Sequence, residues 1–274
     1  MFKIPAKDIE WAFTTPQVMG IINCTHDSFY AASRQENIVT VLEKVGQFVK
    51  EGVAIIDIGA QSTRPNATLL SPANELVQLL TVVKAIRVAY PTLFISIDTF
   101  YAEVADACLT AGANIINDIS CGSFDPAILH VVAKHNAGYI GMHLTGSMQA
   151  MHTIEKRENI MLSLLDYFNE KKNILAPIGI KKWIIDPGFG FGKKVEENFR
   201  IIKELAQLKN IDLPILIGAS RKSSIYKTLG ITPEEALNGT SMVNTIALLN
   251  GANILRVHDV KEAVELVKLL PHLK

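Results

Sequence analysis

Short runs of apolar residues recur along this chain, and each run has the length of a buried strand. The runs are four to six residues long, and most carry no charge before their last position. Their first residues lie about 34 residues apart on average, which is the length of one βα unit. Eight strands are predicted in this way, at residues 18–23, 54–59, 94–98, 115–118, 139–143, 183–186, 215–218 and 254–257.

The segments between the runs have the period of amphipathic helices. Two stripes show this pattern, one formed by Val41, Val45, Phe48 and Val49 and the other by Leu76, Leu79, Leu80, Val83 and Ile86. Ser71-Pro72 and Asp125-Pro126 place a capping residue before a proline, as at helix starts. The stretches 30–39 and 146–157 are polar, and we expect them to be mobile loops.

Apolar strands that alternate with amphipathic helices predict a parallel sheet covered by helices. An open doubly wound sheet and a closed barrel both fit this alternation, and eight units favour the barrel. No repeat, low-complexity run or linker divides the chain. We therefore expect an α/β protein with one (β/α)8 TIM barrel domain over residues 1–274.

Composition narrows the class of partner. The chain has 274 residues, of which 49% are hydrophobic, and its 27 basic residues balance 27 acidic ones, so no basic surface for nucleic acid or anionic lipid is indicated. Charges interrupt the first ten residues, which argues against a signal peptide and for a cytoplasmic protein. Cys24, Cys108 and Cys121 have neither zinc nor redox spacing. A small-molecule partner is expected, with no nucleic acid and no membrane.

Polar residues follow nearly every predicted strand. In a parallel barrel the carboxyl ends of all strands open on one face, so residues far apart in the sequence meet at one mouth. Carboxylates and amides suit the N–H donors of a nitrogen heterocycle, whereas arginine and histidine suit a phosphate. The strand-end residues are Asn23, Asp57, Asp98, Asn117, Asp118, His143, Asp186, Arg221, Lys222, Arg256 and His258, and Arg64 adds a further cation.

Each of these residues has a purely structural alternative. Asp57 would equally cap a segment or join a buried hydrogen-bond network, and Asp186-Pro187 is a turn initiator. Asn117-Asp118 fits a helix cap, and His143 and His258 fit core positions. Gly188, Gly190 and Gly192 match neither dinucleotide nor P-loop motifs and favour a tight loop near a ligand. The combination of opposite charge types on one face, rather than any single residue, indicates a site.

Eight motifs in the chain resemble, in the same order, those of the dihydropteroate synthase family within the pterin-binding barrel superfamily. They are MGIINCTHDSF at 19–29, DIGAQSTRP at 57–65, SIDT at 96–99, NDIS at 117–120, MH at 142–143, DPGFGFGK at 186–193, SRKS at 220–223 and RVHD at 256–259.

The resemblance implies a homodimeric barrel that joins 6-hydroxymethyl-7,8-dihydropterin diphosphate to p-aminobenzoate and releases diphosphate in folate biosynthesis. It assigns the pterin to Asp98, Asn117, Asp186 and Lys222, beside Met142, Phe191 and Gly218. It assigns Mg²⁺ and diphosphate to Asn23, and the leaving group to Arg64, Arg256 and His258. The aminobenzoate is expected against Thr63, Pro65, Phe191, Lys222 and Ser223.

The implied chemistry is a dissociative substitution in which cations assist the departing diphosphate and no side chain acts as nucleophile. The chain departs from the usual family pattern at His26, Gln61, Asn66 and Leu144-Thr145. Two alternatives remain open: a methyltetrahydrofolate-type pterin-binding methyltransferase, which has no diphosphate to stabilise, and an inactive pterin-binding barrel.

Overall fold

The structure is a computed structural model that describes residues 1–7, 9–24, 34–61, 69–144, 153 and 158–273, with no side-chain description for 34–37. Eight parallel strands form its central sheet, in the order β8-β7-β6-β5-β4-β3-β10-β9. A bridge between Ile185 and Ile215 joins the two ends of this order, so the sheet closes into a barrel. The strands are β3 (Gln17–Asn23), β4 (Ile55–Gly59), β5 (Phe94–Asp98), β6 (Ile115–Asp118), β7 (Gly138–Met142), β8 (Ile184–Asp186), β9 (Leu216–Ile217) and β10 (Ile254–Val257).

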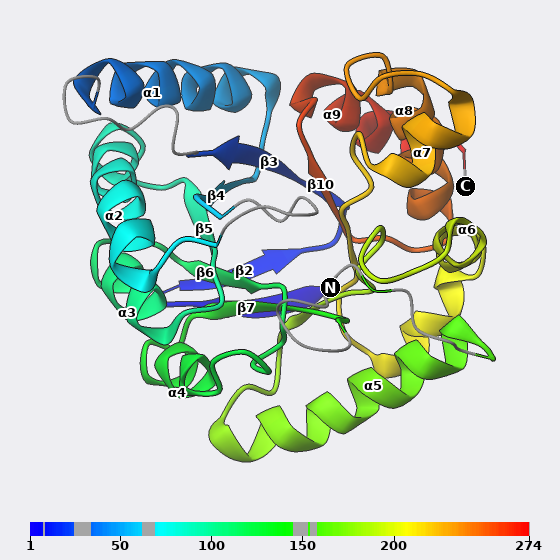
Figure 1. Ribbon diagram of the computed structural model, residues 1–274, viewed down its shortest axis with the longest axis horizontal. Helices are drawn as coiled ribbons and strands as arrows, with labels where there is room; N and C mark the ends of the chain where they lie inside the picture. The colour runs from blue at the N-terminus through cyan, green and yellow to red at the C-terminus, as the bar shows by residue number, and fades with distance from the viewer. Residues whose placement is uncertain (8, 25–33, 62–68, 145–152, 154–157, 274) are drawn as a thin grey trace.

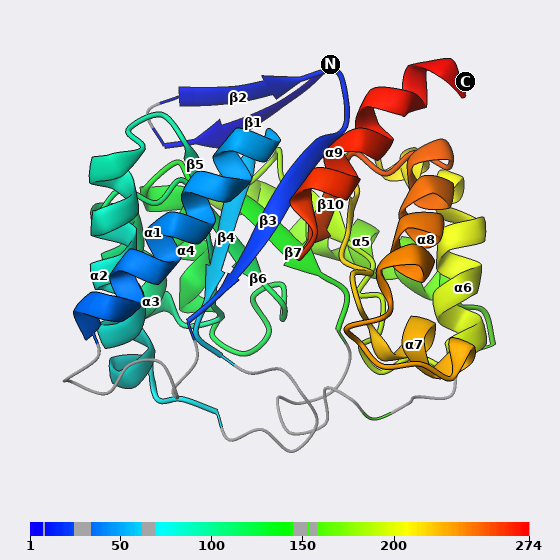
Figure 2. The same ribbon diagram turned by 90° about the horizontal axis from the view of Figure 1, so that it is seen from above.

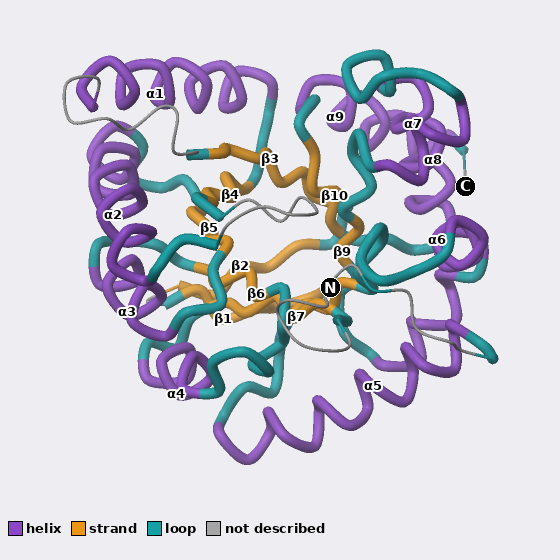
Figure 3. The backbone as a smooth tube through the Cα atoms, viewed as in Figure 1, coloured by secondary structure: helices purple, strands orange, loops and turns teal. Residues whose placement is uncertain are grey.

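Helices surround the barrel in chain order, as Figures 1 and 3 show. They are α1 (Arg34–Glu51), α2 (Pro72–Ala89), α3 (Ala102–Thr110), α4 (Ala127–Lys134), α5 (Ile160–Leu175), α6 (Val195–Lys203), α7 (Ser223–Leu229), α8 (Leu237–Leu249) and α9 (Val260–Leu269), with short 3-10 turns at Ala176–Ile178, Leu205–Ile211 and Leu270–His272. The capping prediction at α2 is confirmed, because the Ser71 side chain accepts a hydrogen bond from the Asn74 N–H and Pro72 follows it. The (β/α)8 barrel is thus the observed fold.

Side chains alternate between the inside and the outside of the barrel along each strand. One apolar residue from each strand contributes to a layer at the amino-terminal end of the interior: Met19, Ile55, Phe94, Ile115, Ile140, Ile184, Leu216 and Ile254. The intervening residues, such as Ile56, Ile116 and Leu255, pack in the larger core with the helices. Because of this alternation, the residue two positions after each member of the apolar layer also faces the interior, closer to the mouth.

A two-stranded hairpin covers this apolar layer, and the sequence patterns did not predict it. Strands β1 (Phe2–Ala6) and β2 (Ile9–Phe13) pair antiparallel, and every second side chain is buried: Ile4, Ala6, Trp11 and Phe13. These four belong to the same cluster as the apolar layer. Figure 2 shows the hairpin at one end of the barrel, with α7 near the opposite end. The hairpin therefore closes the end of the barrel that lies away from the carboxyl ends of the strands.

All eight strand predictions are confirmed to within two residues at either end. The expectation of a mobile loop over 30–39 is wrong in its second half, because α1 begins at Arg34. The other expected loop, 146–157, falls almost entirely outside the described residues. In the described part of the chain, no helix has the length and apolar character needed to cross a bilayer.

Candidate active site

On five of the eight strands, a polar residue lies two positions beyond the apolar layer. Because the strand period is two, these positions face the same interior as the apolar layer but lie closer to the mouth. Asp98 and Asn23 lie two positions farther again on their own strands. The residues at this position on the eight strands, in chain order, are Ile21, Asp57, Ser96, Asn117, Met142, Asp186, Gly218 and Arg256.

Arg256 is the centre of a buried ionic network that joins four strands. Its Nε lies 2.6 Å from Oδ2 of Asp57, and its Nη2 lies 2.6 Å from Oδ2 of Asp98. The Asn117 side chain donates to the same Asp57 oxygen at 3.0 Å. The third guanidinium nitrogen of Arg256, Nη1, makes no hydrogen bond to the described residues. The network therefore fixes the plane of Arg256 and leaves one donor edge for a ligand.

Burial shifts the proton affinities within this network. Desolvation raises the pKa of Asp98 to about 7, although Arg256 opposes the shift, and neighbouring carboxylates add to it. The pKa of Arg256 rises, because Asp57 and Asp98 together outweigh the effect of burial on the cation. The Asp57 side chain is fully buried, whereas those of Asp98 and Arg256 keep about a fifth of their exposure. Arg256 is thus a permanent cation, while Asp98 can change protonation near neutral pH.

Asp186 and Lys222 form a second group of opposite charges in the mouth. Oδ1 of Asp186 accepts the Gly188 N–H at 2.7 Å, which fixes the carboxylate plane. The Lys222 ammonium donates to the Phe189 carbonyl and lies 4.3 Å from the centre of the Phe191 ring. Burial lowers the pKa of Lys222 to about 8 against the attraction of Asp186, and burial also raises the pKa of Asp186. The pair can offer an acceptor and a donor to one flat ligand.

The glycine-rich segment after β8 forms one wall of the mouth, and side chains hold its backbone in place by hydrogen bonds. Lys193 donates to the carbonyls of Gly188 and Phe191 at 2.8 and 3.0 Å. Asn198 accepts the Gly190 N–H at 2.7 Å and donates to Ser224 at 2.9 Å, which ties the segment to α7. Lys193 and Asn198 were missed by sequence reasoning, because neither lies at a strand end. Met142, only 2% exposed, clusters with Phe191 along this wall.

His258 lies at the rim beside Ser220. The Ser220 hydroxyl oxygen accepts the backbone N–H of His258 at 3.2 Å and lies 3.0 Å from its Nδ1. This favours donation by the hydroxyl to Nδ1, which places the imidazole proton on Nε2. Burial lowers the pKa of His258 to about 4, and Arg256 contributes further. At neutral pH His258 is therefore a neutral donor. Ser223 is the first residue of α7, and Asn23 is exposed at the end of β3.

Three predicted strand-end residues point elsewhere. Asp118 binds Ser120, Gly122 and the Tyr139 hydroxyl, so the structural alternative holds for this carboxylate. His143 is buried with its ring 4.8 Å from that of Tyr167, as a core histidine would be. Arg221 pairs with Asp259 rather than with the groups in the mouth.

Asp57, in contrast to these three residues, points into the barrel interior. Of the two structural alternatives for this residue, the buried hydrogen-bond network is observed, and that network holds Arg256. Its other oxygen, Oδ1, is buried and makes no hydrogen bond to the described residues. Asp57 lies two residues after Ile55, which faces the barrel interior, and so it faces the same interior closer to the mouth.

The Gln61 side chain binds Leu70 and Glu75 of α2. Its side-chain oxygen accepts the Leu70 N–H at 3.0 Å, and its nitrogen donates to the Leu70 carbonyl and to the buried Glu75. Burial raises the pKa of Glu75. The predicted ligands Thr63, Arg64 and Pro65, together with the departures His26, Asn66 and Thr145, lie outside the described residues.

The donor set for a metal is sparse. Among the described residues there is no cluster of three or more histidine, cysteine or acidic side chains, and Cys24, Cys108 and Cys121 are all buried thiols. The amide oxygen of Asn23 is a hard donor exposed at the mouth, which fits Mg²⁺, since this ion takes few protein oxygens and completes its shell with phosphate and water.

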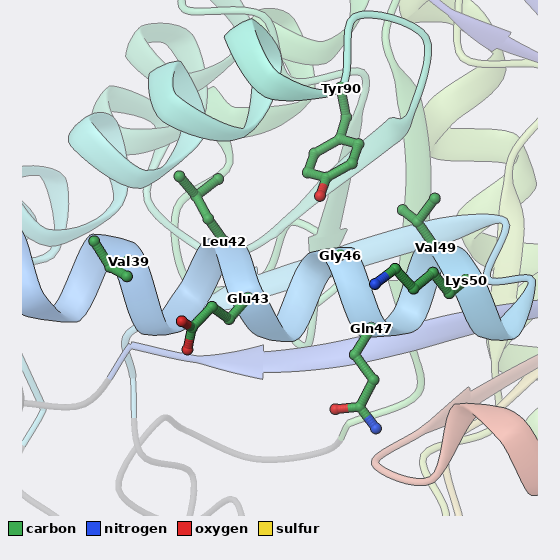
Figure 4. Close-up of a pocket in the computed structure, with 8 residues that line it drawn as sticks. All are labelled: Val39, Leu42, Glu43, Gly46, Gln47, Val49, Lys50 and Tyr90. Carbon is green, nitrogen blue, oxygen red and sulfur yellow. The ribbon is translucent and has the colours of Figure 1, made fainter.

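A hollow of about 730 Å³ lies elsewhere on the surface, between α1 and Tyr90 (Figure 4). Its walls are mainly the aliphatic parts of α1, with Glu43, Gln47 and Lys50 as polar members. None of the strand-end residues lines it. The chemistry of the mouth is therefore separate from this hollow.

The sequence and the fold match those of known proteins. The model of the pterin binding enzyme family matches residues 19–258. A dihydropteroate synthase of Synechocystis sp. is 38% identical over 263 residues, covering 95% of this chain and 90% of the relative. The Yersinia pestis dihydropteroate synthase, solved with a sulfonamide drug complex, superposes with a TM-score of 0.91 at 33% identity, over 99% of both chains. The Xanthomonas albilineans dihydropteroate synthase, solved with 4-aminobenzoic acid, gives a TM-score of 0.89 at 30% identity, over 98% of both chains.

Because the family model covers most of its length, this chain belongs to the pterin binding enzymes. Within the family, the relatives from Synechocystis sp. and Escherichia coli, which match 95% and 98% of this chain, are dihydropteroate synthases.

Proposed function

We propose that residues 1–274 act as one pterin-binding barrel domain with dihydropteroate synthase activity. The reaction joins 6-hydroxymethyl-7,8-dihydropterin diphosphate to p-aminobenzoate and releases diphosphate, giving 7,8-dihydropteroate for folate biosynthesis. The observation that carries the proposal is the arrangement of Asp186 and Lys222 beside the Arg256 network within one barrel mouth.

The pterin fits the interior polar layer. Its amidine-like edge offers two N–H donors, which suit a carboxylate whose plane is fixed, as that of Asp186 is by Gly188. Lys222 would donate to the ring carbonyl and nitrogen, while Asp98 and Asn117 would bind the opposite side of the ring. Met142 and Phe191 supply apolar surface beside it, and Gly218 leaves room next to Arg256.

The diphosphate belongs at the rim. Arg256 would donate from Nη1 and His258 from Nε2, so that developing negative charge on the leaving oxygens meets donors that are already oriented. Arg64 would add a second guanidinium. Asn23 would hold Mg²⁺, which supplies further positive charge to the diphosphate when it is bound. The amine of p-aminobenzoate then attacks the pterin methylene, with Thr63, Pro65 and Ser223 around the aminobenzoate.

A homodimer is the assembly that the surface supports. Met242, Ile246 and Leu249 recur on one face of α8 and are 62%, 38% and 42% exposed, and Leu229 of α7 is 55% exposed. Exposed apolar residues that recur on one helix face are typical of a subunit interface. A cytoplasmic location accords with three buried, unpaired cysteines.

The direct test is incubation with the pterin diphosphate, p-aminobenzoate and Mg²⁺, with mass detection of dihydropteroate and a separate assay of released diphosphate. Product that forms only when all three are present supports the proposal. Pterin binding without diphosphate release would contradict it and favour a methyltransferase or an inactive barrel. Omission of p-aminobenzoate is the matched control, since uncoupled hydrolysis would release diphosphate without forming product.

A further inference from the structure

Arg221 links three segments at the mouth of the barrel. Its guanidinium forms two parallel hydrogen bonds to Asp259, from Nε to Oδ2 at 2.9 Å and from Nη2 to Oδ1 at 2.8 Å. The remaining nitrogen, Nη1, donates to the carbonyls of Pro233 and Glu234 at 3.0 and 2.8 Å. This two-pronged geometry is the strong form of an arginine–carboxylate pair, and the pair is about three-quarters or more buried.

The backbone of Arg221 is held in an uncommon conformation. Its φ of 54° lies in the left-handed region, which disfavours residues with a Cβ. Its N–H donates to the Thr240 hydroxyl of α8 at 3.1 Å. Strained backbone of this kind persists where surrounding contacts hold it, and such positions cluster at functional sites. The conformation of Arg221 sets the direction in which the chain enters Lys222.

Backbone pairing between β9 and β10 ends before the mouth of the barrel. Strands β9 and β10 pair at only two positions, Ile254 with Leu216 and Leu255 with Ile217. Lys222 lies five residues beyond the end of that pairing on one strand, and His258 lies three residues beyond it on the other. Beyond that pairing, two side-chain contacts connect these segments among the described residues: Arg221 with Asp259, and Ser220 with His258.

We infer that Arg221 is a positioning residue: through Asp259 it sets the distance between Lys222, at the pterin, and Arg256 and His258, at the diphosphate. Arg221 immediately precedes Lys222, and Asp259 immediately follows His258, so the bridge acts on both halves of the substrate site. All three guanidinium nitrogens are engaged within the protein, so Arg221 itself does not touch the substrate. The inference rests on the proposed function.

The test weakens the bridge between Arg221 and Asp259 while keeping a positive charge at position 221. Arg221→Lys keeps a cation but cannot bind two carboxylate oxygens and two carbonyls together. We expect kcat/KM for the pterin diphosphate to fall about 10- to 100-fold, the size typical of residues that orient ligating groups. KM for the pterin diphosphate should rise more than KM for p-aminobenzoate, because the bridge spans the two halves of the former.

The partner variant shows whether the two residues act together. Asp259→Asn should reproduce the effect, and the double variant should be no worse than either single variant if the bridge is the cause. Effects that multiply in the double variant would overturn the inference. If Arg221→Lys fails to fold, Asp259→Asn carries the test alone, because it preserves the shape of the side chain.

Arg87→Lys is the matched control. Arg87 is also a partly buried arginine that binds carbonyls, those of Gly112, Tyr90 and Pro91, but it lies at the opposite end of the barrel. The Arg87→Lys variant should have a lower melting temperature but unchanged KM values for the pterin diphosphate and p-aminobenzoate. If Arg221→Lys behaves in the same way, Arg221 has a structural role only and the inference fails. Absence of product from the unmodified enzyme would contradict the proposed function instead, so the two failures are distinguishable.

Discussion

The two ends of the barrel are built on opposite principles from the same eight strands. At the amino-terminal end, the apolar layer is sealed by Trp11 and Phe13 of the hairpin, with ring centres 4.4 Å apart and Trp11 also 5.5 Å from Phe94. At the carboxyl-terminal end, two positions along each strand, the interior holds Asp57 and Asp186 with Arg256. The first end gains stability from apolar burial, whereas the second places charges where only pairing makes them tolerable.

The contrast shows how the fold separates stability from chemistry. Burial of apolar surface needs no particular geometry, and so the hairpin end can hold the barrel closed without involving the mouth. Buried charges, in contrast, are fixed by their partners, which gives the mouth its preorganised donors and acceptors. Substitutions at the two ends should therefore have effects of different kinds.

The largest effect is expected at Arg256. Arg256→Ala should reduce kcat/KM at least 10²- to 10³-fold, the usual loss when an oriented charge-stabilising donor is removed. It should also cost about 3–5 kcal/mol of stability, because Asp57 and Asp98 are left without their cation. Without that cation the pKa of Asp98 rises further above its usual value, so the loss should be greater at pH 8 than at pH 5. Steady-state kinetics and urea unfolding at both pH values check this.

A double variant separates the two consequences of losing Arg256. Arg256→Met combined with Asp57→Asn removes the buried cation together with one buried anion, and should recover most of the stability but none of the activity. Recovery of both would show that Arg256 acts only by neutralising Asp57, contrary to its proposed contact with diphosphate.

At the hairpin end, Trp11→Ala should lower the free energy of unfolding by about 3–5 kcal/mol, the usual cost of truncating a buried tryptophan. Below the new melting temperature, KM and kcat should match those of the unmodified enzyme. Chemical denaturation and kinetics at 20 °C measure both. A tenfold change in KM would mean that the two ends are coupled, and the separation argued above would be wrong.

The smallest effect is expected from pH. We expect binding of 6-hydroxymethyl-7,8-dihydropterin to need an ionised carboxylate cluster that includes Asp98, and a protonated Lys222. Affinity should therefore fall as pH drops below about 7 and again as it rises above about 8. The limits belong to the charge clusters rather than to single residues. Calorimetric titration from pH 5.5 to 9.5 gives the profile, and Asp98→Asn should remove its acidic limb. A flat profile would contradict the protonation states assigned here.

Much of the barrel was readable from the sequence because its strands are continuous apolar runs that end in polar residues. The runs at 94–98, 115–118 and 254–257 coincide with the observed strands. The hairpin escaped prediction because Pro5 and the charges of Lys3 and Glu10 interrupt its apolar pattern, which becomes clear only once every second residue is seen against the barrel. Long-range packing, rather than local propensity, defines those two strands.

The site was predictable in its residue types but not in its partnerships. Arg256 and Asp98 could be placed at strand ends, yet the sequence did not reveal that they pair across 158 residues. Asp118 carries the same local signal as Asp98, and only the direction of its side chain, toward Tyr139, excludes it from the mouth. Side-chain direction follows from strand register, which a motif does not specify.

The glycine segment after β8 also limits how this mouth can evolve. Gly188 and Gly190 have φ values of 71° and 86°, and an added Cβ would lie 2.4 Å from the His143 carbonyl and 2.8 Å from the Lys222 side chain, respectively. A variant library randomised at these two positions would consist mostly of inactive members. Selection for a new ligand or for drug escape would have to act through side chains such as Phe191, while the backbone course of this wall stays fixed.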